Sequence, residues 1–172
     1  MKVVANAGPL IALSKLGILH LLPHLYETVL IPSGVYDEVV THGIELAQPD
    51  AYTVQLAVAR SELTVVSTES TRLSETERDS PLHLGERQVI QLALRESPDW
   101  VLLDDQLARE QAKQNGLRVK GTLGILVQAH RHGLITAQEV ELILQAILDR
   151  DDIWISDILV QRVRSRWRGG GL

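Results

Sequence analysis

The chain of 172 residues has no cysteine and no phenylalanine, and only three tryptophans and three tyrosines. Without thiols it cannot build a disulfide framework, a thiolate zinc site, an iron–sulfur cluster or a cysteine nucleophile. Its apolar runs fall well short of the ~18 residues that a membrane span needs, and its start is apolar too briefly for a signal peptide. We therefore expect a soluble cytoplasmic protein with no membrane contact and a core of Leu, Ile, Val and Ala.

What is present is the composition of a folded globular chain, with 45% hydrophobic and 23% charged residues. The net charge of −5 argues against nucleic-acid binding through bulk positive charge. The charge is uneven: residues 150–172 carry five arginines and three aspartates, a net +2, so the remainder carries −7. This tail is either a solvated last helix or a local phosphate-attracting edge on an acidic body.

Short apolar runs alternate along the chain with helical patterns. Five strands are predicted, at residues 3–5, 28–31, 63–66, 100–103 and 117–119. Continuously apolar strands separated by helices are typical of a parallel sheet that is covered on both faces. The sequence therefore predicts an α/β fold, a three-layer α/β/α domain with a mostly parallel central sheet of about five strands. Residues 67–83 lack periodicity and are expected to form the longest loop.

Polar side chains stand where this topology would bring them together. Asn6 follows the first strand, Asp104 and Asp105 follow the fourth, Glu38 lies in the helix after the second, and Glu86 opens the helix after the long loop. In an open parallel sheet the ligand site lies outside the carboxyl ends of the strands. Oxygen ligands without Cys or His select Mg²⁺ or Mn²⁺. Such an ion would relieve the repulsion between the carboxylates and activate water against a phosphodiester.

Each of these residues also has a structural interpretation. Glu86 would complement a helix N-terminus, Asp104 and Asp105 would cap the next helix, Glu38 would be solvated, and Asn6 would form a turn. Only the convergence of the separate placements favours the metal site, and that convergence depends on the predicted topology.

Competing motifs are weak or missing. The sequence has no phosphate-binding Gly-x-x-x-x-Gly-Lys loop, no Gly-x-Gly-x-x-Gly after the first strand and no Gly-x-Ser-x-Gly elbow. His20 and His24 have a zinc-like spacing, but Pro23 lies between them and no acidic third ligand is near. A receiver-like domain would carry paired acids after the first strand, where this chain has Asn6.

Five segments resemble the PIN domain in order and spacing, and more narrowly a poorly characterised prokaryotic PIN subfamily. They are residues 3–13, 31–39, 84–93, 102–109 and 121–124. The resemblance runs from residue 2 to about residue 135, and residues 154–157 look like the C-terminal helix of that subfamily. It implies a PIN-like catalytic domain at 1–135, with the helices of 136–172 packed on the same single domain.

The resemblance further implies a Rossmann-like fold and an Mg²⁺- or Mn²⁺-dependent endoribonuclease similar to the VapC-like toxins. Proteins of this kind hydrolyse RNA, are often held inactive by a small antitoxin encoded beside them, and commonly form homodimers. The acidic positions of the family fall on Asn6, Glu38, Glu86 and Asp105, with Asp104 as the alternative to Asp105. A further hydroxyl or acid of the family falls on Thr122.

One position departs from the family pattern. Most catalytic PIN domains carry Asp where this chain has Asn6, which offers a carbonyl oxygen to a metal but no charge. We therefore expect weaker metal binding than in those domains. The alternatives are a weakly active or inactive PIN domain that binds nucleic acid or a protein in the same groove, and a purely structural, dimerising domain.

Overall fold

A sheet of five parallel strands forms the centre of the computed structural model, which describes residues 1–68 and 83–168. The strands are β1 (Lys2–Ala5), β2 (Thr28–Pro32), β3 (Thr64–Val66), β4 (Trp100–Leu102) and β5 (Val119–Lys120), in the spatial order β3-β2-β1-β4-β5. The predicted α/β fold with a mostly parallel sheet of about five strands is confirmed.

The central strand shows why the strands read as continuous apolar runs. Val3, Val4 and Ala5 of β1 have no exposed surface, because helices cover both faces of the sheet. On one side Val4 pairs with Leu30 of β2, and on the other with Val101 of β4. Along the chain, β2 and then β3 are added on one side of β1, and β4 and then β5 are added on its other side. Strand order therefore reverses between β1 and β4, the place where open α/β sheets bind ligands.

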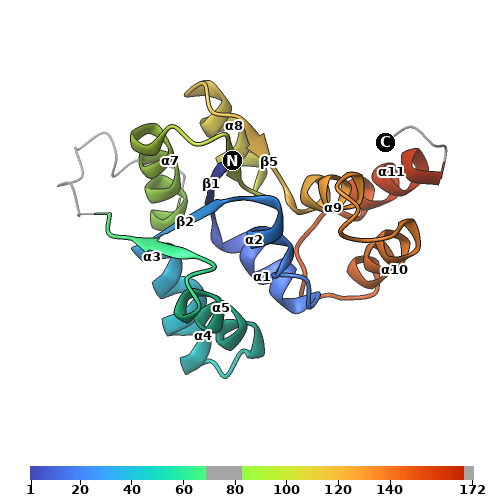
Figure 1. Cartoon of the computed structure of the whole chain (residues 1–172), viewed down its shortest axis with the longest axis horizontal. Coiled ribbons are helices and arrows are strands. Elements are labelled where there is room, and N and C mark those ends of the chain that lie inside the picture. The colour runs from blue at the N-terminus through green and yellow to red at the C-terminus, as the bar shows by residue number, and fades with distance from the viewer. Residues whose placement is uncertain (69–82, 169–172) are drawn as a thin grey trace.

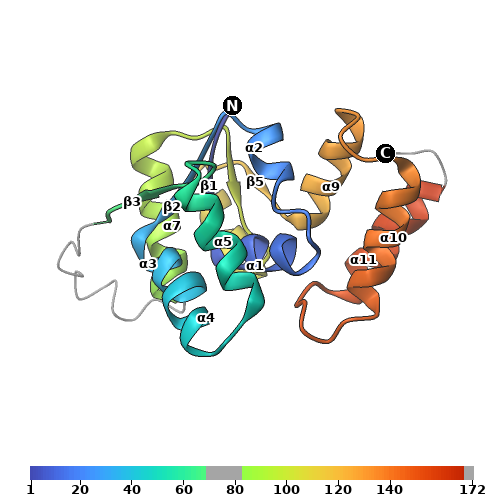
Figure 2. The ribbon, with the colours of Figure 1, turned by 60° about the horizontal axis from the view of Figure 1, so that its bottom comes forward.

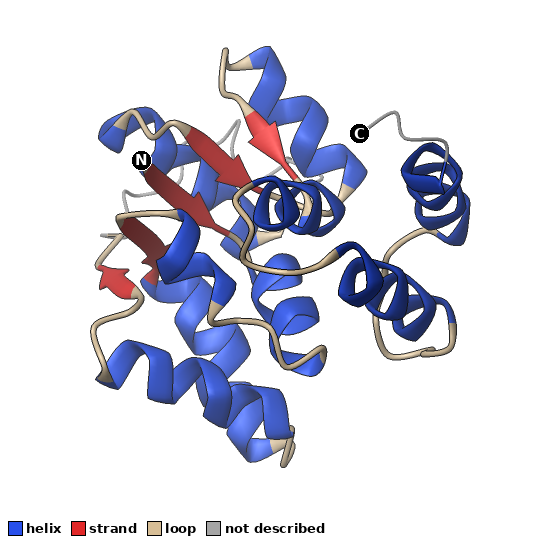
Figure 3. Ribbon diagram, turned by 45° about the vertical axis from the view of Figure 1, so that its right-hand side comes forward, coloured by secondary structure: helices blue, strands red, loops and turns tan. Residues whose placement is uncertain are grey.

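Helices cover the two faces of the sheet (Figures 1 and 3). On one face α7 (Leu84–Glu96) packs against β1, β2 and β4, and α8 (Gln106–Gln114) packs against β5. On the other face lie α1 (Ala7–Lys15), α2 (Leu21–Leu25) and α9 (Thr122–Arg131); α9 contacts both α1 and α2. Beyond β2 follow α3 (Ser33–Tyr36), the π-helical turn η1 (Asp37–Thr41), α4 (His42–Glu45) and α5 (Pro49–Ala59). None of the helices in the described part of the chain has both the length and the apolar character of a membrane span.

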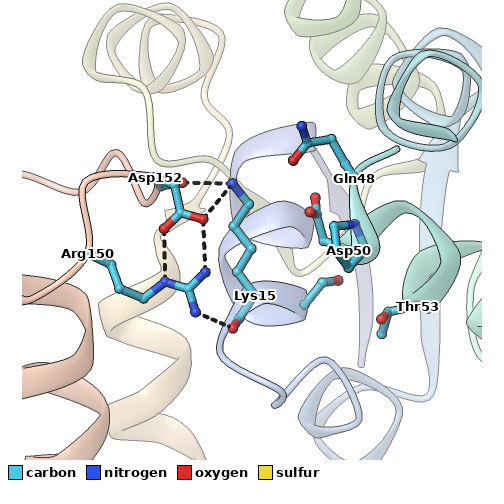
Figure 4. A pocket seen from close by; sticks show the side chains of 8 residues that line it. Lys15, Gln48, Asp50, Thr53, Arg150 and Asp152 are labelled. Atoms are coloured by element: carbon cyan, nitrogen blue, oxygen red, sulfur yellow. Dashed lines mark hydrogen bonds and ion pairs between the residues drawn. The ribbon is translucent and has the colours of Figure 1, made fainter. Parts of the chain in front are cut away.

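Two C-terminal helices flank the domain on the α9 side (Figure 2). α10 (Ala137–Leu148) packs on α9, and α11 (Asp157–Arg168) packs on α10. The loop between them is held to the end of α1 by ion pairs (Figure 4). Arg150 forms a two-pronged pair with Asp152 at 2.9 Å and donates to the Lys15 carbonyl, while the Lys15 ammonium lies 3.1 Å from Asp152 Oδ2. These residues border a polar cavity of about 280 Å³.

Several local predictions differ from the structure. One helix was expected after the second strand, capped by Ser33 and ending near Gly43. Instead Pro32 is the N-cap, a π-helical turn interrupts the helix at Asp37–Thr41, and it continues to Glu45. The extra residue of a π-turn is set by tertiary packing and leaves no periodic signal.

Two further differences concern short elements, and one prediction lies mostly outside the described residues. The short helix α2 was not predicted, because a single turn carries no measurable period, and β5 begins two residues later than expected. Of the predicted 67–83 loop, residues 69–82 lie outside the described residues.

Candidate metal centre at the carboxyl edge of the sheet

Asn6 ends β1 at the point where strand order reverses. Its backbone N–H donates to the Leu102 carbonyl at 3.1 Å, which fixes it beside the end of β4. The residue is only 7% exposed, and as the N-cap of α1 its side chain makes no capping hydrogen bond. Its Oδ1 is buried without a partner among the described residues. A buried acceptor left unpaired costs about 1–3 kcal/mol, so this atom is ready to accept an incoming cation or donor.

Glu38 approaches Asn6 across the first turn of α7. A Cβ built on Gly85 would lie 3.0 Å from Glu38 Oε2 and 4.0 Å from Asn6 Oδ1. The two oxygens are thus at most about 7 Å apart, the sum of those distances. Glu38 lies in the π-helical turn η1, and π-turns are frequent at functional sites. Sequence reasoning assigned no role to Gly85, although a glycine in the first turn of a helix is the signal for such a close approach.

Glu86 has two roles that the sequence left open. Its Oε2 accepts a hydrogen bond from the His83 backbone N–H at 2.9 Å and completes a capping box at the start of α7. It is also close to Glu38: burial raises the pKa of the Glu38 carboxyl, and the charge of Glu86 raises it further, whereas His83 and His42 lower it. Two carboxylates that repel one another beside an unpaired amide oxygen form a strongly electronegative corner.

Asp104 follows the neighbouring strand β4 and is held by the start of α9. Its Oδ1 accepts from the Thr122 N–H at 2.8 Å and its Oδ2 from the Thr122 hydroxyl at 2.6 Å. Burial raises the pKa of Asp104, while the two hydrogen bonds from Thr122 and the charge of Arg109 lower it. A Cβ on Gly121 would lie 2.8 Å from Asp104 Oδ1, so only glycine lets the chain enter α9 at this distance.

Asp105 points to its own helix. It is exposed, and its Oδ1 accepts from the Ala108 N–H at 2.8 Å as the N-cap of α8. Arg109, which sequence reasoning did not consider, donates to the Leu103 carbonyl at 2.8 Å and lies beside Asp104. No pattern in the sequence distinguished this arginine from others on helix surfaces.

The side chains at this edge form two groups. Asn6, Glu38 and Glu86 make one, and Asp104 with Thr122 makes the other. The second group borders the first turn of α1, because a Cβ on Gly8, two residues after Asn6, would lie 3.8 Å from Asp104 Oδ2. In residues 1–68 and 83–168, no three acidic or histidine side chains are arranged closely enough to hold a metal ion among themselves.

Comparison with known proteins identifies the family of the chain. The family model DUF3368, described as a PIN domain, matches residues 2–168. The chain belongs to the PIN-domain family. In fold, this PIN domain is similar to a PilT N-terminus domain protein from the hyperthermophilic archaeon Sulfolobus solfataricus P2, with a TM-score of 0.55, 15% identity and coverage of 75% of this chain and 93% of that one.

The chain is also similar to a second solved structure, a domain of a functionally unknown protein from Methanocaldococcus jannaschii DSM 2661. Its TM-score is 0.48 at 16% identity, with coverage of 70% of this chain and 89% of that one. A search of curated proteins finds no match to the chain.

PIN domains are generally nucleases and typically use divalent metal ions. The donors at this edge suit such an ion, because the amide oxygen of Asn6 and the carboxylates of Glu38, Glu86 and Asp104 are all hard oxygen ligands. Among these donors only Asn6 Oδ1 is both buried and without a hydrogen-bond partner in the described part of the chain.

Proposed function

We propose that this PIN domain is a Mg²⁺- or Mn²⁺-dependent endoribonuclease, and that it is the toxin component of a toxin–antitoxin pair, active as a homodimer. One observation carries the nuclease part of the proposal. Asn6 Oδ1, which has no donor among the described residues, and Glu38 Oε2 approach each other over Gly85. A divalent cation is the ligand that best satisfies two converging hard oxygens.

The side chains would share the work as follows. A bound divalent cation supplies charge stabilisation at the phosphate and a water of lowered pKa. Asn6, Glu38, Glu86 and Asp104 would hold it. Thr122 keeps the Asp104 carboxylate in its orientation through the hydrogen bonds at 2.6 and 2.8 Å. Arg109, fixed by the Leu103 carbonyl, offers a cation at the rim to the flanking phosphate.

A second candidate function uses the same groove without catalysis. It is favoured by Asn6 itself, which replaces a carboxylate by a neutral amide and so removes one negative charge from the site. A site of this kind would bind RNA or a partner protein without hydrolysing a bond. The nuclease needs a divalent metal ion to hydrolyse RNA, whereas the binding module needs none.

The experiment compares Glu86→Gln with a matched control. Glu86 and Glu139 are both capping-box glutamates, at the N-termini of α7 and α10. Glu139→Gln therefore makes the same change in a capping box that lies away from the sheet edge. Wild type and each variant are incubated with RNA in Mn²⁺, with and without EDTA, and melting temperatures are measured in both buffers. We expect Mn²⁺-dependent cleavage and Mn²⁺ stabilisation in wild type and Glu139→Gln, and neither in Glu86→Gln.

Other outcomes select between the two functions. Cleavage that survives in Glu86→Gln or in EDTA would mean a contaminating nuclease or another site. RNA binding without cleavage and without a response to Mn²⁺ would favour the binding module. Growth arrest on expression of wild type but not of Glu86→Gln tests the toxin role.

A further inference from the structure

The loop just before α11 and one side of α11 itself expose an unusual set of side chains. Trp154 is 92% exposed, Ile158 72% and Leu159 47%. Arg162 and Arg166 follow Ile158 at intervals of four residues, so they continue the same stripe along the helix. We call these five residues the α11 face.

Four arginines of the tail have described side chains, and they divide into two kinds. Arg150 is paired with Asp152, and Arg164 with Glu141 of α10. Arg162 and Arg166 are exposed and form no hydrogen bond or ion pair with any described residue. Two of these four positive charges thus pair with acids of the protein, and the other two are exposed on the α11 face.

The α11 face is held rigidly by its surroundings. Ile153 is 6% exposed and Val160 is fully buried, so the residues on either side of the exposed stripe are anchored in the core. The loop before the helix is tied to α1 through Lys15, Arg150 and Asp152 (Figure 4). A surface ordered in this way loses little conformational entropy when a partner binds.

The chemistry of the α11 face selects the kind of partner. An exposed tryptophan with arginines and aliphatic side chains is the composition of a binding hot spot between proteins. A single strand of RNA would stack on Trp154 and pair with the arginines, but would leave Ile158 and Leu159 uncovered. A second copy docked about a twofold axis that passes through the middle of the α11 face would bring the same arginines of the two copies together.

We propose that the α11 face docks an acidic, amphipathic segment of a partner protein. Apolar side chains of that segment cover Trp154, Ile158 and Leu159, and its carboxylates pair with Arg162 and Arg166. This surface is separate from the sheet edge, so the inference is independent of nuclease activity.

The test selects peptides from a random display library on the wild-type chain and measures the winning synthetic peptides by fluorescence. Trp154 is a reporter, because its emission shifts to the blue when the indole is covered; Trp154→Phe identifies its share of the signal. We expect the winners to be rich in Asp, Glu and spaced apolar residues. Trp154→Ala and the reversal Arg162→Glu/Arg166→Glu should each weaken binding about tenfold or more, and salt should weaken it further.

Matched controls decide the result. Arg60→Glu reverses an exposed arginine at the end of α5, on the side of the molecule away from α11 (Figure 2), and should leave peptide affinity unchanged. The proposal is wrong if the winners are not acidic, or if none of them needs Trp154 and the two arginines. It is equally overturned if a single-stranded RNA or an anionic vesicle binds the α11 face more tightly than the peptides, or if sedimentation shows that the face is covered by a second copy.

Discussion

Replacing Asn6 by Asp tests directly whether Asn6 and Glu38 face a common space. The two oxygens are at most about 7 Å apart. A new carboxylate at that distance from Glu38 costs about 2 kcal/mol at an effective dielectric constant near 20. Glu38 is exposed, and solvent screening reduces the figure to roughly 1 kcal/mol.

The assay is a double-mutant cycle of Asn6→Asp and Glu38→Gln in EDTA, read as free energies of unfolding. Asn6→Asp alone should lower the melting temperature by about 2–4 °C for each kcal/mol in a chain of this size. Glu38→Gln should remove the part of that loss that comes from repulsion, a coupling energy of roughly 1 kcal/mol. The cycle isolates the repulsion, because the cost of burying the new carboxylate is common to the single variant Asn6→Asp and the double variant.

In Mn²⁺, unlike in EDTA, Asn6→Asp should be more stable than the wild type. With four carboxylates in place of three, Asn6→Asp binds the ion more tightly, and at a hundredfold excess over Kd the ion adds about 2.7 kcal/mol. The reasoning fails if the cycle is additive in EDTA, since the two side chains then do not share a space. It also fails if Mn²⁺ stabilises the wild type more than Asn6→Asp.

Two other predictions concern the second acid and the response to pH. Asp104→Asn should abolish stabilisation by Mn²⁺, whereas Asp105→Asn should keep it and change the melting temperature little, because Asn also caps helices well; the reverse result would make Asp105 the ligand. Because the pKa of Glu38 is raised above 4.5 by burial and by Glu86, the native state holds this proton to higher pH than the unfolded chain does. The free energy of unfolding in EDTA should therefore fall as pH rises from about 4.5 through the folded pKa, and denaturant titrations should show a smaller fall in Glu38→Gln.

The sheet could be predicted because its physical signals are local and strong. The three central strands β1, β2 and β4 are short runs of mostly buried β-branched and aliphatic residues, and the alternation with helices is typical of parallel pairing. Gly17, Gly116 and Gly133 end helices with φ of 71°, 76° and 71°, a conformation that favours glycine. These helix ends were visible in the sequence for the same reason.

The arrangement within the site could be predicted only in part. Strand order brings Asn6 and Asp104 to neighbouring strand ends, which topology alone implies. The direction of a side chain after a strand depends on the next helix, however, and the spacing could not tell Asp104 from Asp105. The structure separates them, since Thr122 holds Asp104 and the start of α8 engages Asp105. The π-turn that carries Glu38 has no sequence signal at all.

Helix N-termini explain how acidic side chains can gather at this edge of the sheet without a bound cation. They also show which polar atom is left without a donor. The N-terminus of α9 donates to Asp104 through Thr122, and the start of α7 engages Glu86 through the His83 N–H, so each dipole stabilises one carboxylate. Glycines at the entry to both helices let the backbone come this close. The start of α1 provides no such donor to Asn6, whose Oδ1 stays buried and unpaired among the described residues. Backbone N–H groups thus stabilise the carboxylates of Asp104 and Glu86, whereas Asn6 Oδ1 receives no donor. We therefore expect a bound cation to be most strongly stabilised beside Asn6.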